Sequence, residues 1–264
     1  HVIRAEEHLS NTPRQIFIFE GLGAPLPQFA HLPVVAEPGS RVKLSKRKLD
    51  KYLKNPEFAE LYQHGRRIAD RLGLEVSPET FNPVITDFYR IAGFLPEAIL
   101  NYLLLLGWSL DDKTEMLSPA EQIAHFSLER VNKAAASFDP KKLVSFQERY
   151  MQALSVDERL ALTLPFVEQA GWIPSPASAA DGEKVRGIVA AASDRIKVSG
   201  DILDYDEFFV ADEALAYDPK AFDKRIRGAA GARALLAELR SAIAALPSDA
   251  PFDAAAVESL LNDF

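Results

Sequence analysis

Strand-like apolar runs occur only in the opening part of this chain, and this uneven distribution constrains the fold more than any other feature. Residues 2–4 have the form of a strand end, and residues 29–35 form a short apolar run typical of a buried strand. Between them, residues 12–22 carry the pattern of a helix. A strand, a helix and a second strand in this order predict one crossover of an α/β sheet.

Start and stop signals define this first helix. Thr12 is a capping residue, and Pro13 suits the first helical turn. Gln15 then completes a capping box with Thr12, and Gly23 ends the helix. We therefore expect the hydroxyl of Thr12 to be used locally, at the helix end.

After a turn at residues 37–40, helix patterns follow one another. The first covers residues 49–72 and breaks near Asn55 and Pro56. Further helices are expected at 97–106 after Pro96, at 118–126, at 140–153 after the capping residue Asp139, at 183–193 and at 229–245. Residues 171–182 have the composition of a linker.

Length and composition exclude several classes of protein. A chain of 264 residues with 48% hydrophobic content is long enough for about two domains. It has no cysteine, which excludes disulfides, thiolate zinc sites and a cysteine nucleophile. The longest apolar run, 99–106, is far shorter than the roughly 20 residues that span a bilayer. The first residue is not Met and the last residues have the pattern of an interrupted helix, so we expect a fragment of a longer chain.

Charge is distributed unevenly. The net charge is −8, yet residues 41–54 hold seven cations against the single acid Asp50: Arg41, Lys43, Lys46, Arg47, Lys48, Lys51 and Lys54. Such a stretch is either a phosphate or nucleic-acid contact or a solvated helix face, and charge alone leaves both open. Residues 200–218 hold seven acids, four aromatic residues and no base, which indicates solvated acids along a packed aromatic edge.

One group of residues has the chemistry of a ligand site. Arg4, Glu6 and Glu7 follow the first strand, at the carboxyl edge where open α/β sheets bind ligands. After the second strand, the loop 43–47 offers three cations and a hydroxyl, which suit a polyphosphate. An arginine at the sheet edge suits a carboxylate. These residues predict a nucleotide site beside an anion site, although surface ion pairs would use the same residues.

The loop Lys43-Leu44-Ser45-Lys46-Arg47 resembles the KMSKS-type signature loop of class I aminoacyl-tRNA synthetases, in the KLSKR form of glutamyl enzymes. Further blocks resemble the same family and follow in family order at 1–15, 29–33, 93–98, 101–103, 106–109, 126–131 and 138–143. They cover about residues 1–150, and the likeness is thinner beyond. The chain thus resembles the C-terminal part of a bacterial-type glutamyl-tRNA synthetase.

The resemblance implies an α/β fold, the second half of a class I Rossmann-type catalytic domain, followed by mainly α-helical domains. Residues 1–48 would be the C-terminal part of the catalytic domain, and 49–88 a helical insertion. Residues 89–170 would form a helical stem-contact domain, and 171–264 the start of a helical anticodon-binding domain. These helices argue against a glutaminyl enzyme, which uses β-barrels there, and against the shorter tRNA-modifying paralogue.

The resemblance also implies glutamate–tRNA ligase activity in protein biosynthesis. Such enzymes join glutamate to ATP to give glutamyl-adenylate, then pass the glutamyl group to the 3′ end of tRNA(Glu). ATP would enter with Mg²⁺, and the chain itself would hold neither zinc nor another metal. We expect a cytoplasmic monomer without a membrane contact.

Site residues are carried over position by position. Arg4 would bind glutamate, Glu7 would contact ATP, and Lys46, with Lys43, would be catalytic by stabilising the departing phosphates. The complete ATP-binding set would be Glu7, Lys43, Leu44, Ser45, Lys46 and Arg47. His31 is expected to be structural, and both tryptophans, Trp108 and Trp172, to lie in the core.

The sequence lacks the HIGH-type motif of the first nucleotide-binding half. We therefore expect this chain to be inactive by itself. The alternative is a tRNA-binding paralogue or module without catalytic activity.

Overall fold

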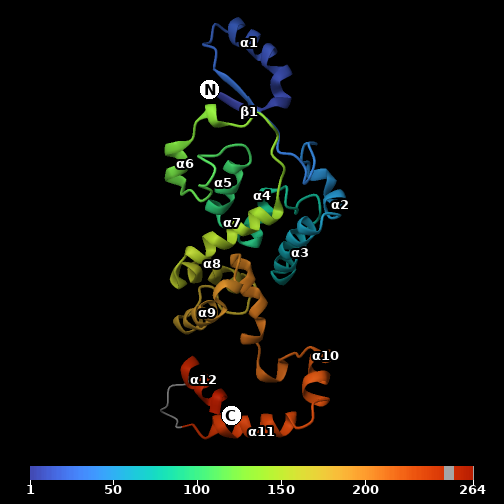
Figure 1. Cartoon of the computed structure of the whole chain (residues 1–264), viewed down its shortest axis with the longest axis vertical. Helices are drawn as coiled ribbons and strands as arrows, with labels where there is room; N and C mark the ends of the chain where they lie inside the picture. Colours follow the sequence, from blue (N-terminus) through green and yellow to red (C-terminus); the bar gives the residue numbers. More distant parts are fainter. Residues whose placement is uncertain (247–252, 264) are drawn as a thin grey trace. The chain divides into compact units, whose positions relative to one another are not determined.

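A computed structural model describes residues 1–246 and 253–263 of the chain. They form two compact units, His1–Phe209 and Val210–Phe264 (Figure 1). The first unit opens with α/β structure and continues with helices, as the sequence predicts. The predicted domain boundaries at 48, 88 and 170 stay predictions.

The opening segment is a parallel crossover. Strand β1 (Val2–Ala5) leads through a 3₁₀ turn, η1 (Glu6–Asn11), into helix α1 (Thr12–Gly21), and strand β2 (Phe29–Leu32) returns beside β1. The two strands pair in parallel from Val2 opposite Phe29 to Ala5 opposite Leu32. The second strand is shorter than the predicted run because Pro33, which has no N–H group, follows it.

The start of α1 differs from the prediction. Neither Asn11 at the N-cap nor Thr12 caps the helix with its side chain, so the predicted capping box is wrong. The hydroxyl of Thr12 instead accepts a hydrogen bond from Nη2 of Arg4 at 2.9 Å. The hydroxyl that the local sequence pattern predicted as a helix cap thus binds Arg4, a residue of another element. The helix end is confirmed, since Gly23 adopts a φ of 64° just beyond it.

Helices make up the rest of the first unit: α2 (Leu49–Tyr52), α3 (Pro56–Arg71), α4 (Thr86–Ala92), α5 (Pro96–Leu105), α6 (Pro119–His125), α7 (Pro140–Ala153), α8 (Val156–Gln169) and α9 (Ala179–Ala192). Segments of 3₁₀ helix lie before, between and after them: η2 (Lys46–Lys48), η3 (Leu128–Arg130), η4 (Ser193–Arg195) and η5 (Ser199–Phe208). The side chains of Asn55, Ser118 and Asp139 cap α3, α6 and α7, which confirms these starts. Helix α9 begins inside the predicted linker because Ser178 and Asp181 form a capping box.

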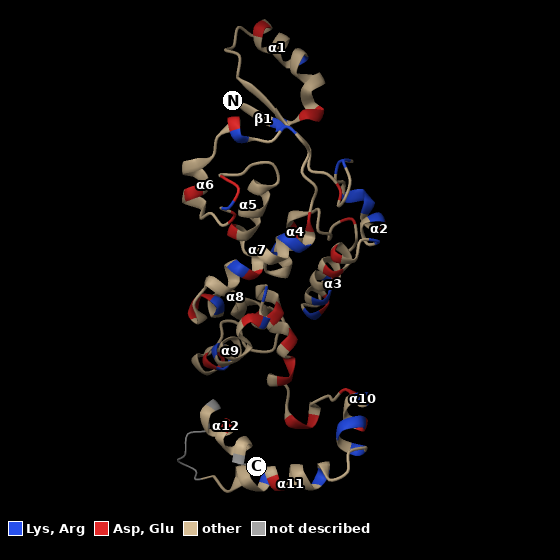
Figure 2. Ribbon diagram, viewed as in Figure 1, with Lys and Arg blue, Asp and Glu red and all other residues tan. Residues whose placement is uncertain are grey.

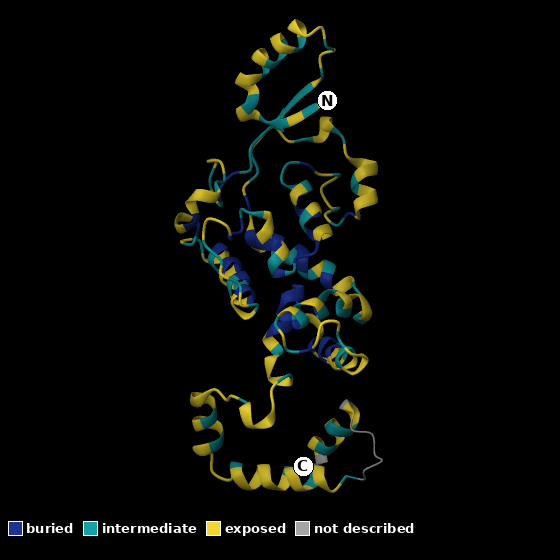
Figure 3. Cartoon of the chain, turned by 180° about the vertical axis from the view of Figure 1, so that it is seen from behind, coloured by how far each residue is buried: buried dark blue, intermediate teal, exposed yellow. Residues whose placement is uncertain are grey.

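Aromatic side chains dominate the core of this unit. Phe58 from α3, Phe88 from α4 and Tyr102 from α5 are almost completely buried. The buried residues continue from these helices into α7, α9 and η5 (Figure 3). Each such side chain contributes on the order of 1.5–3 kcal/mol by burial. Helices α3 and α4 approach closely at Gly65, where an added Cβ would lie 2.5 Å from the ring of Phe88. The segment 49–88 therefore shares the core with the helices that follow it.

The acidic segment departs from its expected solvated state at Asp201. This side chain is 7% exposed, accepts hydrogen bonds from the amides of Lys197 and Val198, and lies 2.5 Å from Nε2 of His64. The expected aromatic edge is confirmed only in part: Phe209 packs on Trp172 at 5.3 Å between ring centroids, whereas Phe208 and Tyr217 are exposed. The acid was misjudged because its partner His64 is 137 residues away in the sequence.

The second unit contains η6 (Asp212–Ala214), α10 (Pro219–Phe222), the π-helical turn η7 (Asp223–Arg227), α11 (Ala232–Ala244) and α12 (Ala254–Asp263). Helix α11 matches the predicted Ala-rich helix and starts after Gly231, whose φ is 81°. No helix in the described parts of the two units is long and apolar enough to cross a membrane.

Candidate active site

Arg4 is held at the carboxyl end of β1 by its neighbours. Its Nε donates to Nε2 of His31 at 3.3 Å, and its Nη2 donates to the hydroxyl of Thr12. The guanidinium also lies over the ring of Phe29, 5.4 Å from the ring centroid. His31, in β2, therefore orients the side chain of Arg4, which is a structural role, as predicted. A planar, always charged donor fixed at a sheet edge is suited to a carboxylate ligand.

The second predicted group, Glu7, meets the signature loop. Nζ of Lys43 lies 2.6 Å from both carboxylate oxygens of Glu7, across 36 residues of sequence. The hydrogen bond from Lys43 lowers the pKa of Glu7, so the carboxylate is charged near neutral pH. Both side chains are about half exposed, and an exposed pair of this kind is weak. The contact joins the end of β1 to the loop and remains open to an incoming ligand.

The backbone of the signature loop 43–47 is fixed at several points. Lys43 pairs with Ala36 in an antiparallel bridge, and the amide of Leu44 donates to the carbonyl of Val35 at 2.8 Å. The amide of Ser45 donates to the hydroxyl of Tyr52 at 2.9 Å. The hydroxyl of Ser45 in turn accepts from the amide of Arg47 at 3.5 Å. Leu44 packs against the core, and the side chains of Lys46 and Arg47 are exposed.

Acidic partners divide the seven cations of the basic stretch into two groups. Lys43 pairs with Glu7, while Lys48 and Lys51 pair with Glu37. Within the described residues, four cations make no ion pair: Arg41, Lys46, Arg47 and Lys54. Figure 2 shows the basic cluster around α2 and the turn before it. The ion pairs thus separate three cations of the stretch from four that have no acidic partner among the described residues, and both interpretations of the stretch stay predictions.

Glu37 is the residue of this region that the sequence analysis missed. Its side chain is 2% exposed, which is unusual for a glutamate. The available signal was a lone acid at the end of an apolar run, directly before a turn and a basic stretch. Without the fold, that pattern does not show that Lys48 and Lys51 turn back toward it.

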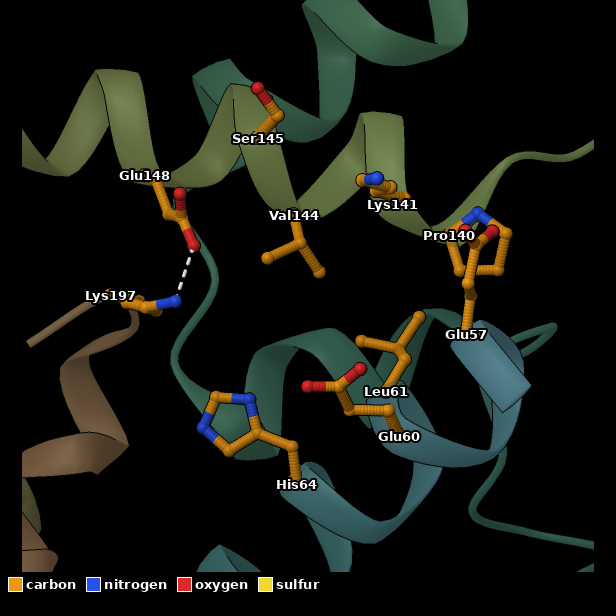
Figure 4. Close-up of a pocket in the computed structure, with 10 residues that line it drawn as sticks. All are labelled: Glu57, Glu60, Leu61, His64, Pro140, Lys141, Val144, Ser145, Glu148 and Lys197. Carbon is orange, nitrogen blue, oxygen red and sulfur yellow. Dashed lines mark ion pairs between the residues drawn. The ribbon is translucent and has the colours of Figure 1, made fainter.

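A pocket of about 510 Å³ lies elsewhere, between α3 and α7 (Figure 4). Charges of both signs line it, among them Glu57, Glu60 and Lys141, and Nζ of Lys197 pairs with Glu148 at 2.7 Å on its rim. None of the predicted site residues lines this pocket. Across residues 1–246 and 253–263, no three His, Asp or Glu side chains gather closely enough to hold a metal ion.

The candidate site lies at the carboxyl end of β1 and is open to solvent. An oriented arginine lies near the end of β1, and the Glu7–Lys43 contact connects this end to a fixed loop in which two further exposed cations, Lys46 and Arg47, make no ion pair among the described residues. Such an arrangement can bind a carboxylate at one end and a polyphosphate at the other, and it can stabilise negative charge that develops between them.

Comparison with protein families matches both parts of the chain. Residues 1–67 and 80–145 match the catalytic domain of class I tRNA synthetases (E and Q), and residues 158–264 match an anticodon binding domain. The first match leaves out residues 68–79, which lie at the end of α3 and in the loop after it.

Individual relatives agree with this match. The chain is 38% identical to the glutamate–tRNA ligase of Moorella thermoacetica over 98% of its own length and 45% of that protein. It is 34% identical to glutamate–tRNA ligase 1 of Acidithiobacillus ferrooxidans over 100% of its own length and 47% of that protein. The solved structure of a glutamate tRNA ligase from Elizabethkingia meningosepticum, in complex with its amino acid, superposes with a TM-score of 0.69 at 30% identity, over the whole chain and 47% of that protein. The chain thus spans less than half the length of these relatives, and it belongs to the class I tRNA synthetases of the glutamyl and glutaminyl type.

Proposed function

We propose that this chain is part of a glutamate–tRNA ligase, in which it supplies the signature loop, one edge of the glutamate site and the helices that bind tRNA. The observation that carries the proposal is the contact between Glu7 and Lys43. It brings together the strand edge and the KLSKR loop, which are separate in the sequence and each carry part of the predicted chemistry.

Each site residue has a distinct task in this proposal. Arg4, oriented by Thr12 and His31, binds a carboxylate of glutamate. Lys46 extends from the fixed loop and stabilises the charge that gathers on the β- and γ-phosphates as pyrophosphate departs. Activation needs no covalent bond to the enzyme, so positioning and electrostatic stabilisation are sufficient.

ATP brings Mg²⁺ as its own partner in this reaction. In this proposal, Glu7 and Lys43 form the border of the site on the side where ATP binds. The two side chains are in contact with each other there. Lys43 gains a stronger partner when a phosphate replaces Glu7, since the phosphate carries more charge. The chain needs no protein metal site for this role.

Transfer of the glutamyl group requires tRNA, and the match of residues 158–264 to an anticodon binding domain supports tRNA as the partner. We assign tRNA(Glu) because the named relatives are glutamate–tRNA ligases. A monomer located in the cytoplasm is part of the same proposal.

ATP–pyrophosphate exchange tests the proposal. Glutamate-dependent exchange, with total tRNA present, is measured on this chain and on a version extended upstream to the full length of the relatives. Exchange in the extended protein alone is the expected result. Tight tRNA binding without exchange in either protein would instead favour a binding module without catalysis.

A further inference from the structure

The buried carboxylate of Glu37 has no part in the reaction proposed above, yet it lies beside the signature loop. Nζ of Lys48 reaches one oxygen of Glu37 at 3.0 Å, and Nζ of Lys51 reaches the other. The hydrogen bonds from Lys51 and Lys48 lower the pKa of Glu37, although its burial acts in the opposite direction. The carboxylate is therefore a fixed negative charge directly behind the loop.

The backbone around Glu37 cannot easily move. Its amide donates to the carbonyl of Val42 at 2.7 Å, which closes the turn before the loop. Its carbonyl accepts from the hydroxyl of Ser137 at 2.9 Å. Ala36, the preceding residue, is fully buried and hydrogen-bonds to the segment before α7 through both its amide and its carbonyl. Glu37 is thus anchored to the helical core and can serve as a fixed point.

Tyr52 connects this fixed point to the loop itself. Its hydroxyl lies 3.3 Å from Oε1 of Glu37 and accepts from the amide of Ser45 at 2.9 Å. Burial raises the pKa of Tyr52, so the hydroxyl keeps the proton that it donates to Glu37. The side chain is 3% exposed and packs against the ring of Phe58, which leaves the hydroxyl little freedom.

The loop is therefore held on both sides of Lys46. Tyr52 fixes Ser45 before it, and Glu37 fixes Lys48 and Lys51 after it. The side chain of Asn82, which is fully buried, reaches the carbonyl of Lys46 itself at 3.5 Å. The same contacts pair the charges of Lys48 and Lys51 with Glu37, although both side chains stay about half exposed, so that fewer unpaired cations compete with Lys46 for a phosphate.

We propose that Glu37 and Tyr52 are positioning residues for the signature loop: they set the direction of Lys46, and Glu37 pairs with two neighbouring lysines that would otherwise compete for the phosphates. This inference rests on the proposed function, since it concerns the presentation of Lys46 to ATP. Neither residue touches the reacting atoms.

Amide hydrogen exchange tests the structural half on the 264-residue chain, with no need for activity. Tyr52→Phe removes only the hydroxyl, so the amide of Ser45 should exchange about ten-fold faster or more. The amide of Phe58, which donates to Asn55 at 2.9 Å, is the internal reference and should not change. An unchanged Ser45 amide in Tyr52→Phe would overturn the positioning role.

Kinetics on the upstream-extended protein test the functional half. Glu37→Gln should lower kcat for ATP–pyrophosphate exchange by about ten-fold or more, with the KM for glutamate nearly unchanged. Glu37→Asp keeps the charge and should retain more activity than Glu37→Gln. The matched control is Glu115→Gln, which removes a similar partner from Lys142 and should leave kcat unchanged.

The outcomes separate the two proposals. An unchanged kcat in Glu37→Gln would overturn the positioning role even if the loop loosens. If the unsubstituted extended protein shows no glutamate-dependent exchange, the proposed function is wrong, and the Ser45 amide still decides whether Tyr52 holds the loop.

Discussion

At the scale of single residues, Arg4 shows how ordinary neighbours prepare a charged group for a ligand. A long side chain loses conformational freedom when it binds, and this cost opposes affinity. Thr12, His31 and Phe29 reduce that cost because they hold the guanidinium before a ligand arrives. In the proposed site, Thr12, His31 and Phe29 would thus contribute to binding by orienting Arg4.

Arg4→Ala should raise the KM for glutamate in the extended protein by about ten-fold or more and leave the KM for ATP nearly unchanged. The expected split follows from the proposal that Arg4 at the strand edge binds glutamate, whereas residues of the loop 43–47 bind the phosphates of ATP. Steady-state ATP–pyrophosphate exchange at varied glutamate and varied ATP measures both constants. The exposed helix residue Arg14, changed to Ala, is the control. A rise in the KM for ATP would remove Arg4 from the glutamate site.

Lys46→Ala should slow adenylate formation by about ten-fold or more, with little loss of tRNA affinity. In the proposed reaction its charge would act on the departing phosphates, and its side chain makes no ion pair among the described residues that would hold it elsewhere. Rapid-quench measurement of the first turnover isolates this step. Lys54→Ala removes an exposed cation of the same basic stretch outside the loop and should react at the normal rate. Equal slowing in both variants would indicate a general charge effect.

At the scale of elements, the helix starts that could be predicted from the sequence are those set by hydrogen bonds between residues close in the chain. The starts of α3, α6 and α7 could be predicted because Asn55, Ser118 and Asp139 satisfy amides three residues away. The role of Thr12 could not be predicted, because Arg4 competes for the same hydroxyl from another element. The same holds for the site: the loop residues were found by pattern, whereas Glu37 became recognisable only from the lysines that turn back toward it.

The contact of α3 with α4 can be tested at Gly65. Alanine favours a helix by about 1 kcal/mol over glycine, but a Cβ here would lie 2.5 Å from the buried ring of Phe88. Gly65→Ala should therefore destabilise the chain by about 1–3 kcal/mol, because the ring has to move. Gly187→Ala in α9 is the matched control, since a Cβ there meets nothing within 4 Å, and it should be neutral or slightly stabilising. Urea unfolding compares the two, and equal stability would show that the helices separate easily.

At the scale of the whole molecule, the net charge is negative, although local clusters of cations are suited to binding nucleic acid. The net charge of −8 opposes general attraction to nucleic acid. The second unit nevertheless places six cations between residues 220 and 240 against the two acids Asp223 and Glu238. If this acidic chain binds tRNA as proposed, its confined basic patches would be the places that meet phosphates, which favours one binding geometry over many.

This distribution predicts which cations in the second unit bind tRNA. Lys224 and Arg225 lie in η7, are exposed and make no ion pair within the described residues, whereas Arg227 pairs with Asp223 at 2.9 Å. Replacing Lys224 and Arg225 together by Ala should weaken tRNA binding and reduce the slope of log affinity against log salt by about 1–2. Arg227→Ala should change the slope less, because Asp223 already neutralises that side chain. Filter binding of total tRNA to the 264-residue chain, across a range of salt concentrations, measures all three proteins. A slope that is the same in the double variant and the unsubstituted chain would place the phosphate contacts outside η7.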